Sequence, residues 1–209
     1  MSLAIRRSPM TDAHAKLGAR VERRAGWEVV ADYGDVDVER TALRERVGIG
    51  DVTSRGKIDV RGDVDAVLRG ATGGVVARIA DDWALVVTGP GGEPDVMPAM
   101  EQAARGSAAL LTDVTHLYAG LALIGPALPE VCARLSSWDP AGLRPGDATG
   151  ASFADVRAIV RRPDDGPAAL ELYVGAESAR YAWETVAAVV AGQGGRPVGL
   201  TALLAEGWS

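Results

Sequence analysis

Short runs in which apolar and polar residues alternate recur along the chain, and segments with helical spacing lie between them. Alternation places every second side chain on one face and predicts β-strands, at residues 57–60, 83–88, 118–124, 156–161 and 170–174. Apolar residues three or four positions apart predict helices, at residues 11–24, 38–47, 64–68, 96–104, 128–135 and 178–190. This order predicts an α+β fold, with helices packed on mixed or antiparallel sheets.

An internal repeat begins near residue 50. Asp51-Val52-Thr53 recurs as Asp113-Val114-Thr115, and each copy is followed by a strand, a glycine, an amphipathic helix, a further strand and a further helix. A three-residue identity recurs easily by chance, so the alternative is two ordinary α+β halves that coincide. The shared order of elements favours a duplication.

The repeat also predicts how the chain is organised. We expect a single domain over residues 1–209, with a first half at about 50–110 and a second half at about 111–209. Residues 1–49 are predicted to form a helical cover. The segment 136–167 is rich in Pro, Gly and Asp and is predicted to be the most irregular part of the chain.

Composition limits the classes of partner. Of the 209 residues, 47% are hydrophobic and 24% charged, which is typical of a globular protein. The net charge of −6 disfavours nucleic acid and anionic membrane surfaces as partners. The apolar stretches are far shorter than the roughly 20 residues of a membrane span. Cys132 is the only cysteine, and residues 1–10 lack a secretion signal, so we expect a cytoplasmic protein.

Most catalytic chemistry is disfavoured by the residues present. A metal site is not predicted, because His14 and His116 lie far apart in the sequence and only one cysteine accompanies them. His116 is more often a structural residue in such a position, since no partner stands at a recognisable spacing from it or from Cys132. The segment Gly89-Pro90-Gly91-Gly92 could cradle an anion, but a plain turn is favoured because the Lys-Ser/Thr of a phosphate loop is missing.

Two acidic positions are candidates for a site. Asp81-Asp82 precedes an apolar strand, where a solvated turn is the usual interpretation, although one carboxylate in a pocket could relay a proton. Alternation in 170–174 puts Glu171 and Tyr173 on one face of a strand. If that face meets solvent, Glu171 is a surface residue, which the pattern alone favours. If it borders a cleft, Glu171 beside Tyr173 suits two N–H bonds from the amide edge of a heterocycle.

The N-terminal third of the chain resembles the aminomethyltransferase family, typified by the glycine-cleavage T-protein. The residues that carry this resemblance are His14, 17–20, 25–28, Tyr33, 44–45, Gly48, 51–53 and 56–58. Further on, residues 121–126 are similar to that family's "LALQGP" segment, and residues 171–174 to the strand after its "GYTGEDGFE" motif. From about Asp82 the chain is also similar to the γ subunit of heterotetrameric sarcosine oxidase, at residues 82–86, 143–146 and 173–183.

The resemblance implies two pseudo-symmetric ferredoxin-like halves that enclose a tetrahydrofolate site. Glu171 falls on the family's pterin-binding Glu, and Arg161 on the Arg ten residues before it. Tyr173, Arg55 and Thr88 are assigned to the same site by the resemblance. Reduced folate is the implied ligand, and flavoprotein or lipoyl-carrier subunits are the implied partners.

Departures from the family pattern leave two functions open. The segment 62–83 is shorter than in the T-protein, residues 162–168 replace "GYTGEDG", and the chain ends where a C-terminal barrel domain would begin. We therefore expect the catalytic Asp segment to be deleted, which favours a folate-binding module or accessory subunit in glycine or sarcosine metabolism. The alternative is a reduced aminomethyltransferase that transfers a one-carbon unit to tetrahydrofolate, with Asp81 as acid/base and Glu171 as pterin anchor. A repurposed scaffold without a folate site is the remaining possibility.

Overall fold

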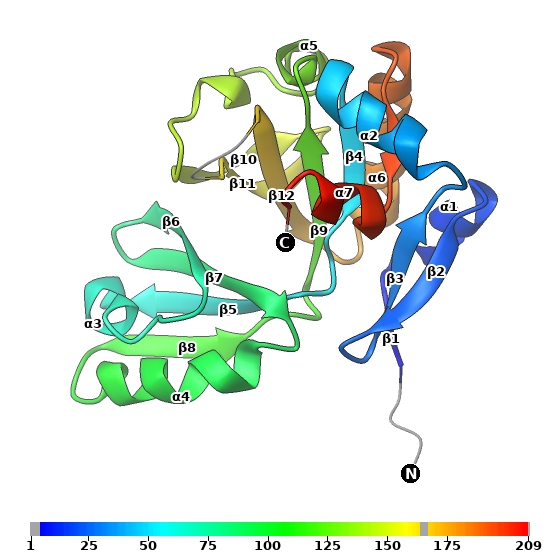
Figure 1. Ribbon diagram of the computed structural model, residues 1–209. Helices are drawn as coiled ribbons and strands as arrows, with labels where there is room; N and C mark the ends of the chain where they lie inside the picture. The colour runs from blue at the N-terminus through cyan, green and yellow to red at the C-terminus, as the bar shows by residue number, and fades with distance from the viewer. Residues whose placement is uncertain (1–4, 164–166, 209) are drawn as a thin grey trace.

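Three sheets organise the computed structural model, which describes residues 5–163 and 167–208 (Figure 1). Residues 164–166, in the segment that replaces the "GYTGEDG" motif, lie outside the described residues. Within the described ranges, no helix has both the length and the apolar character needed to cross a membrane.

The four-stranded sheet is a complete ferredoxin-like unit. Its elements follow the order strand, helix, strand, strand, helix, strand: β5 (Arg55–Gly62), α3 (Val64–Leu68), β6 (Val75–Ala80), β7 (Trp83–Pro90), α4 (Glu93–Ala104) and β8 (Ala109–Asp113). The spatial order β6-β7-β5-β8 is fully antiparallel. Alternation divides its side chains: Ile58 and Val86 face α3 and α4, whereas Leu85 and Val87 face the six-stranded sheet.

The six-stranded sheet repeats this unit and enlarges it. Its elements are β9 (Tyr118–Ile124), α5 (Leu128–Leu135), β10 (Ala148–Phe153), β11 (Val156–Arg161), β12 (Ala169–Gly175), α6 (Ala179–Gly192) and β13 (Arg196–Val198). In the order β10-β11-β12-β9-β4-β13, strand β4 (Gly48–Asp51) is inserted between the first and last strands of the unit. The insertion links the N-terminal segment to the second half through backbone hydrogen bonds.

Residues 136–163 are more regular than the sequence indicated. After a short 3-10 helix, η1 (Pro140–Gly142), strands β10 and β11 form an antiparallel hairpin in register. Its turn is Ala154-Asp155, where both residues have positive φ values of 51° and 60°, as a tight two-residue turn requires. The strand predicted at 156–161 is confirmed as β11, whereas the expectation of an irregular insertion was wrong for 148–153, because strand pairing supplies the order that composition does not reveal.

The N-terminal cover is not entirely helical. Its elements are β1 (Arg6–Arg7), α1 (Thr11–Lys16), β2 (Arg20–Arg24), β3 (Trp27–Asp32) and α2 (Val36–Glu45). The single helix expected over 11–24 was wrong: α1 ends at Lys16, Gly18 adopts φ 74°, and β2 pairs with β3 across a tight turn at Ala25-Gly26. Helix α2 begins two residues earlier than expected, because the Asp35 side chain accepts the N–H groups of Asp37 and Val38.

Two segments carry the chain between the main sheets, and each begins with one copy of the repeat. The first passes from β4 to β5 and the second from β8 to β9, side by side (Figure 1). Each copy forms the same turn. Asp51 Oδ1 accepts the Thr53 N–H at 2.8 Å, and Asp113 Oδ1 accepts the Thr115 N–H at 2.9 Å.

Each turn binds the strand that follows the other turn. We call this arrangement the reciprocal crossover (residues 51–57 and 113–120). Thr53 Oγ1 accepts the Gly120 N–H at 3.1 Å, and Thr115 Oγ1 accepts the Lys57 N–H at 2.9 Å. The backbone N–H of Val52 donates to the Gly120 carbonyl, and that of Val114 to the Lys57 carbonyl, at 2.9 Å in both cases. The two copies are therefore structurally equivalent, and each half positions the first strand of the other.

Replacing Thr115 with valine tests the reciprocal crossover. Thr115→Val keeps the side-chain shape but leaves the buried Lys57 N–H without its acceptor, so we expect a loss of about 1–3 kcal/mol in unfolding free energy. Urea denaturation followed by circular dichroism measures it. The control is Thr112→Val on β8, where the side chain is exposed and the expected change is within about 0.5 kcal/mol. Equal losses in both variants would contradict the structural role.

Candidate functional site

A cavity of about 330 Å³ opens where the reciprocal crossover, the end of β7 and helix α7 (Leu200–Ala205) meet. Its walls are largely apolar and come from all three sheets and from α7, whereas its charged groups are mostly arginines. The lining residues are Arg24, Val29, Asp51, Val52, Ser54, Arg55, Gly73, Gly74, Val75, Val87, Thr88, Gly89, Pro90, Arg161, Glu171, Leu200, Leu203, Leu204 and Trp208. Four of the residues assigned by resemblance are thus brought to one cavity: Arg55, Thr88, Arg161 and Glu171.

Glu171 is the buried acid of this cavity. It lies on β12 and is 3% exposed, so the interpretation of Glu171 as a surface residue was wrong. The prediction that Glu171 and Tyr173 share one face of the strand was correct. Leu170 and Leu172 enter the core beneath α5 and α6, while Glu171 and Tyr173 point the other way. That second face is covered by the four-stranded sheet, which no local pattern could reveal.

Three donors from the described part of the chain hold the Glu171 carboxylate. Arg55 Nη1 donates to Oε1 at 2.5 Å, and Arg161 Nη1 and the Tyr173 hydroxyl donate to Oε2 at 3.1 and 2.9 Å. Burial alone would raise the pKa of Glu171, but Arg55 and Arg161 outweigh it and hold the pKa below its usual value. Burial and the neighbouring carboxylate raise the pKa of Tyr173, which therefore stays a hydroxyl donor.

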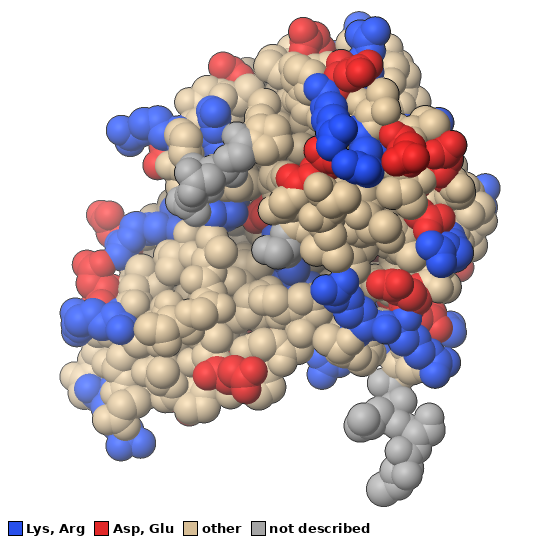
Figure 2. All heavy atoms as spheres, in the orientation of Figure 1, with Lys and Arg blue, Asp and Glu red and all other residues tan. Residues whose placement is uncertain are grey.

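The elements explain how these side chains meet. Arg161 stands directly opposite Glu171 in the antiparallel pair β11 and β12, so the sheet itself aligns the ion pair. Arg55 comes from the reciprocal crossover, and Thr88 lies near the end of β7, where its hydroxyl donates to the Gly89 carbonyl at 2.9 Å. A row of basic side chains also follows the boundary between the lower four-stranded lobe and the rest of the molecule (Figure 2).

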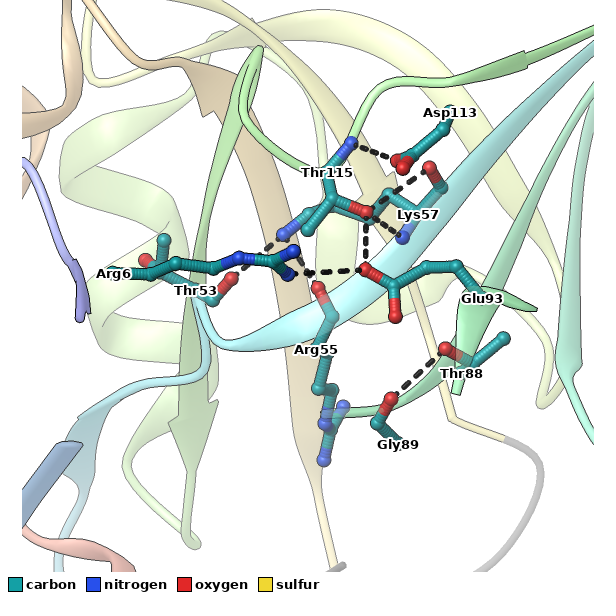
Figure 3. Close-up of polar contacts among 9 residues, drawn as sticks. All are labelled: Arg6, Thr53, Arg55, Lys57, Thr88, Gly89, Glu93, Asp113 and Thr115. Carbon is teal, nitrogen blue, oxygen red and sulfur yellow. Dashed lines mark hydrogen bonds and ion pairs between the residues drawn. The ribbon is translucent and has the colours of Figure 1, made fainter. Parts of the chain in front are cut away.

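Beside the cavity lies a buried polar cluster centred on Lys57. Lys57 Nζ donates to the carbonyl oxygens of Thr53 and Arg55, at 2.8 Å each, and thereby fixes the backbone from which the Arg55 side chain extends. Thr115 donates to Glu93 Oε1 at 2.9 Å, at the start of α4. Figure 3 shows the Arg55 side chain directed away from this cluster. Burial lowers the pKa of Lys57 to about 8.

A second group absent from our predictions joins the N-terminal segment to the cavity wall. The ionised Asp51 carboxylate accepts the His14 Nε2–H at 2.8 Å, and the Tyr33 hydroxyl lies 2.9 Å from His14 Nδ1. His14 also packs edge-on against Trp183 of α6, with ring centroids 4.5 Å apart. His14, Tyr33 and Asp51 are all among the residues that carry the family resemblance, but the 37 positions between His14 and Asp51 leave no local signal that they meet.

Asp81 is not brought to the cavity. It is exposed in the turn between β6 and β7, whereas the cavity touches the opposite end of that hairpin, at the paired Val75 and Val87. At about 3.3 Å per strand residue, the separation is roughly 20 Å. Among the described residues, no group of three or more His, Cys, Asp or Glu side chains is arranged to hold a metal ion.

The remaining reactive residues have structural surroundings. His116 is exposed and stacks on Trp27, with ring centroids 5.7 Å apart. Cys132 lies in the core beneath α5, where burial raises the pKa of its thiol to about 12. Gly91 takes φ 74° in the loop before α4, so the segment 89–92 forms a turn, and Gly89 and Pro90 contribute to the cavity edge.

The model of the GCVT N-terminal domain family matches residues 70–205. The chain belongs to this family. An aminomethyltransferase from Geobacillus kaustophilus is 32% identical over 228 residues, covering 95% of this chain and 62% of that protein. One from Parafrankia sp. is also 32% identical, with the same coverage. The chain thus spans about 62% of the length of these curated relatives, and the predicted membership of the aminomethyltransferase family is confirmed.

Solved structures confirm the predicted fold of this GCVT-family chain. The glycine cleavage system aminomethyltransferase T from Bartonella henselae aligns over 96% of this chain and 61% of its own, with a TM-score of 0.78 and 21% identity. A chain of the heterotetrameric sarcosine oxidase from Corynebacterium sp. U-96 aligns over 75% of this chain and 91% of its own, with a TM-score of 0.63 and 15% identity. At these identities the likeness concerns the fold.

The buried Lys57 predicts an unusual pH dependence of stability. Its pKa in the folded protein, about 8, is below its ordinary value of 10.5, so between these values the unfolded chain binds a proton that the native protein has released. Stability from this group therefore rises with pH. We expect the unfolding free energy of the wild type relative to Lys57→Met to rise by about 1–3 kcal/mol from pH 8 to 10.

Urea unfolding at several pH values measures this difference. The neutral amine keeps two N–H donors for its two carbonyl acceptors, so the contacts survive deprotonation. Lys16→Met, at the exposed end of α1, is the control for loss of a lysine. If Lys57→Met and Lys16→Met change the pH dependence of the unfolding free energy equally, the assignment to Lys57 is contradicted.

Proposed function

We propose that this protein binds a reduced folate, tetrahydrofolate, in the cavity at Glu171. The observation that carries the proposal is an ionised carboxylate at the base of a cavity with apolar walls. A pterin is a flat heterocycle whose edge carries neighbouring N–H donors, and a carboxylate is the acceptor that such an edge requires. Val75 and Val87 from the four-stranded sheet, together with Leu203 and Trp208 near the C-terminus, line the cavity and offer apolar surface to its faces.

The family supports this proposal. The aminomethyltransferase resemblance assigns Glu171, Arg161, Tyr173, Arg55 and Thr88 to one folate site. All but Tyr173 line the cavity, and the Tyr173 hydroxyl donates to Glu171 from beneath it. We infer that the protein acts in one-carbon metabolism of glycine or sarcosine.

We also propose that the protein is an accessory subunit or binding module. One structural neighbour is a chain of a heterotetrameric sarcosine oxidase. A flavoprotein or lipoyl-carrier subunit is therefore the class of partner that we expect, in the cytoplasm. The alternative, one-carbon transfer with Asp81 as acid/base, requires that carboxylate at the cavity, and the hairpin of β6 and β7 holds it roughly 20 Å away.

Calorimetric titration with tetrahydrofolate, under reducing conditions, tests the binding proposal. We expect a dissociation constant in the micromolar range, about −8 kcal/mol. Leu204→Glu should weaken binding about tenfold, because it removes an apolar wall contact worth about 1.5 kcal/mol. Leu204 is 39% exposed, so the substitution leaves the core intact. The matched control is Leu110→Glu on β8, 64% exposed and not part of the cavity lining.

A second variant tests the carboxylate itself. Glu171→Gln removes a charged acceptor, and we expect binding to weaken by about 1.5–3 kcal/mol. The change removes the carboxylate that Arg55 and Arg161 share, so unfolding free energy should also fall by about 1–3 kcal/mol. Circular dichroism checks that the variant is folded at the titration temperature. Glu184→Gln, which breaks an exposed pair with Arg180, is the control.

Absence of heat with millimolar tetrahydrofolate would refute the proposal for the isolated chain. Equal affinity in the wild type and in Leu204→Glu would show that the ligand binds elsewhere.

A further inference from the structure

We infer that Arg55 is an internal competitor of the ligand: its guanidinium occupies the Glu171 oxygen that a folate requires and must be displaced when the folate binds. The inference rests on the proposed function and concerns the same cavity. It makes Arg55 a determinant of affinity, in addition to any part it has in stability.

The acceptor sites of Glu171 are nearly all in use. A carboxylate offers about four lone-pair sites, two on each oxygen. Oε2 accepts from both Arg161 and Tyr173, and Oε1 accepts from Arg55. Counting donors from the described residues, one site remains, on Oε1, whereas the edge of a pterin presents two adjacent N–H donors. Displacement of the Arg55 contact would open both sites of Oε1.

Of the three donors, Arg55 is the one that can move. Arg161 is aligned with Glu171 by strand pairing, and its side chain is 4% exposed. Tyr173 is fully buried on the same strand as Glu171. The Arg55 side chain is 12% exposed and lines the cavity. Its backbone carbonyl is held by Lys57 Nζ, so a rearrangement of the guanidinium leaves this contact of the crossover in place.

Glu171 keeps an ionic partner when Arg55 leaves. Among the described residues, Arg55 and Arg161 each form an ion pair with its carboxylate. With Arg55 removed, the pair of Glu171 and Arg161 remains, and Glu171 is not left as an unpaired buried charge. Arg55 is therefore dispensable for neutralising Glu171, while its place on the cavity wall brings it into competition with a ligand.

The test compares Arg55→Met with the wild type by calorimetric titration with tetrahydrofolate. We expect Arg55→Met to bind about tenfold more tightly or better, because the ligand no longer has to break a charged hydrogen bond. The matched control is Arg44→Met, which removes an arginine paired with Glu206 on the surface, and its affinity should equal that of the wild type. Equal or weaker binding by Arg55→Met would overturn the inference.

A double variant shows whether the gain acts through Glu171. In the Glu171→Gln background, Arg55→Met should no longer strengthen binding, since there is no carboxylate to release. An undiminished gain in that background would overturn the inference. Binding by the wild type without a gain in Arg55→Met refutes the competition but leaves the proposed function standing. If Arg55→Met binds tetrahydrofolate and the wild type does not, the competition and the proposed function are both supported. If neither the wild type nor any variant binds it, both are refuted.

Discussion

The reciprocal crossover is the constraint on which the rest of the molecule depends. The chain must pass twice between the two main sheets, and each passage buries backbone groups that need partners. Each copy of the Asp-Val-Thr turn satisfies its own amide through Asp and binds the first strand of the opposite half through Thr. The orientation of the two sheets is thereby determined by hydrogen bonds rather than by apolar packing alone, and Arg55 is brought to Glu171 as a consequence.

Only the first half keeps the plain ferredoxin-like topology, and the second half is an enlarged version of it. The four-stranded sheet keeps its first and last strands, β5 and β8, adjacent, whereas the second sheet admits β4 between β9 and β13 and adds β10 at its edge. Strand β4 brings the N-terminal segment into contact with the second half, and His14 adds a contact with Trp183 of α6. Both halves, the N-terminal hairpin of β2 and β3, and helix α7 all contribute residues to the cavity wall. Neither half therefore contains the whole site.

Electrostatics sets the character of that cavity. Glu171 stays ionised in the interior because Arg55 and Arg161 outweigh the effect of burial on its pKa. Lys57, close by, has no acidic partner within ion-pair distance among the described residues, and burial lowers its pKa. The same interior thus favours the charged form of one group and the neutral form of another, according to whether an opposite charge is in direct contact.

Local pattern by itself determined much of the chain. The strands at 118–124 and 156–161 and the helix at 128–135 follow from alternation and spacing, and the Asp-Val-Thr repeat indicated the two halves. Family resemblance pointed to Glu171, Arg161, Tyr173, Arg55 and Thr88. Only the tertiary structure decided that the polar face of β12 is buried, that Asp81 lies at the far end of its hairpin, and that residues 20–24 form a strand. The physical reason is that local pattern reports which side chains share a face, whereas burial and strand pairing depend on what distant segments place against that face.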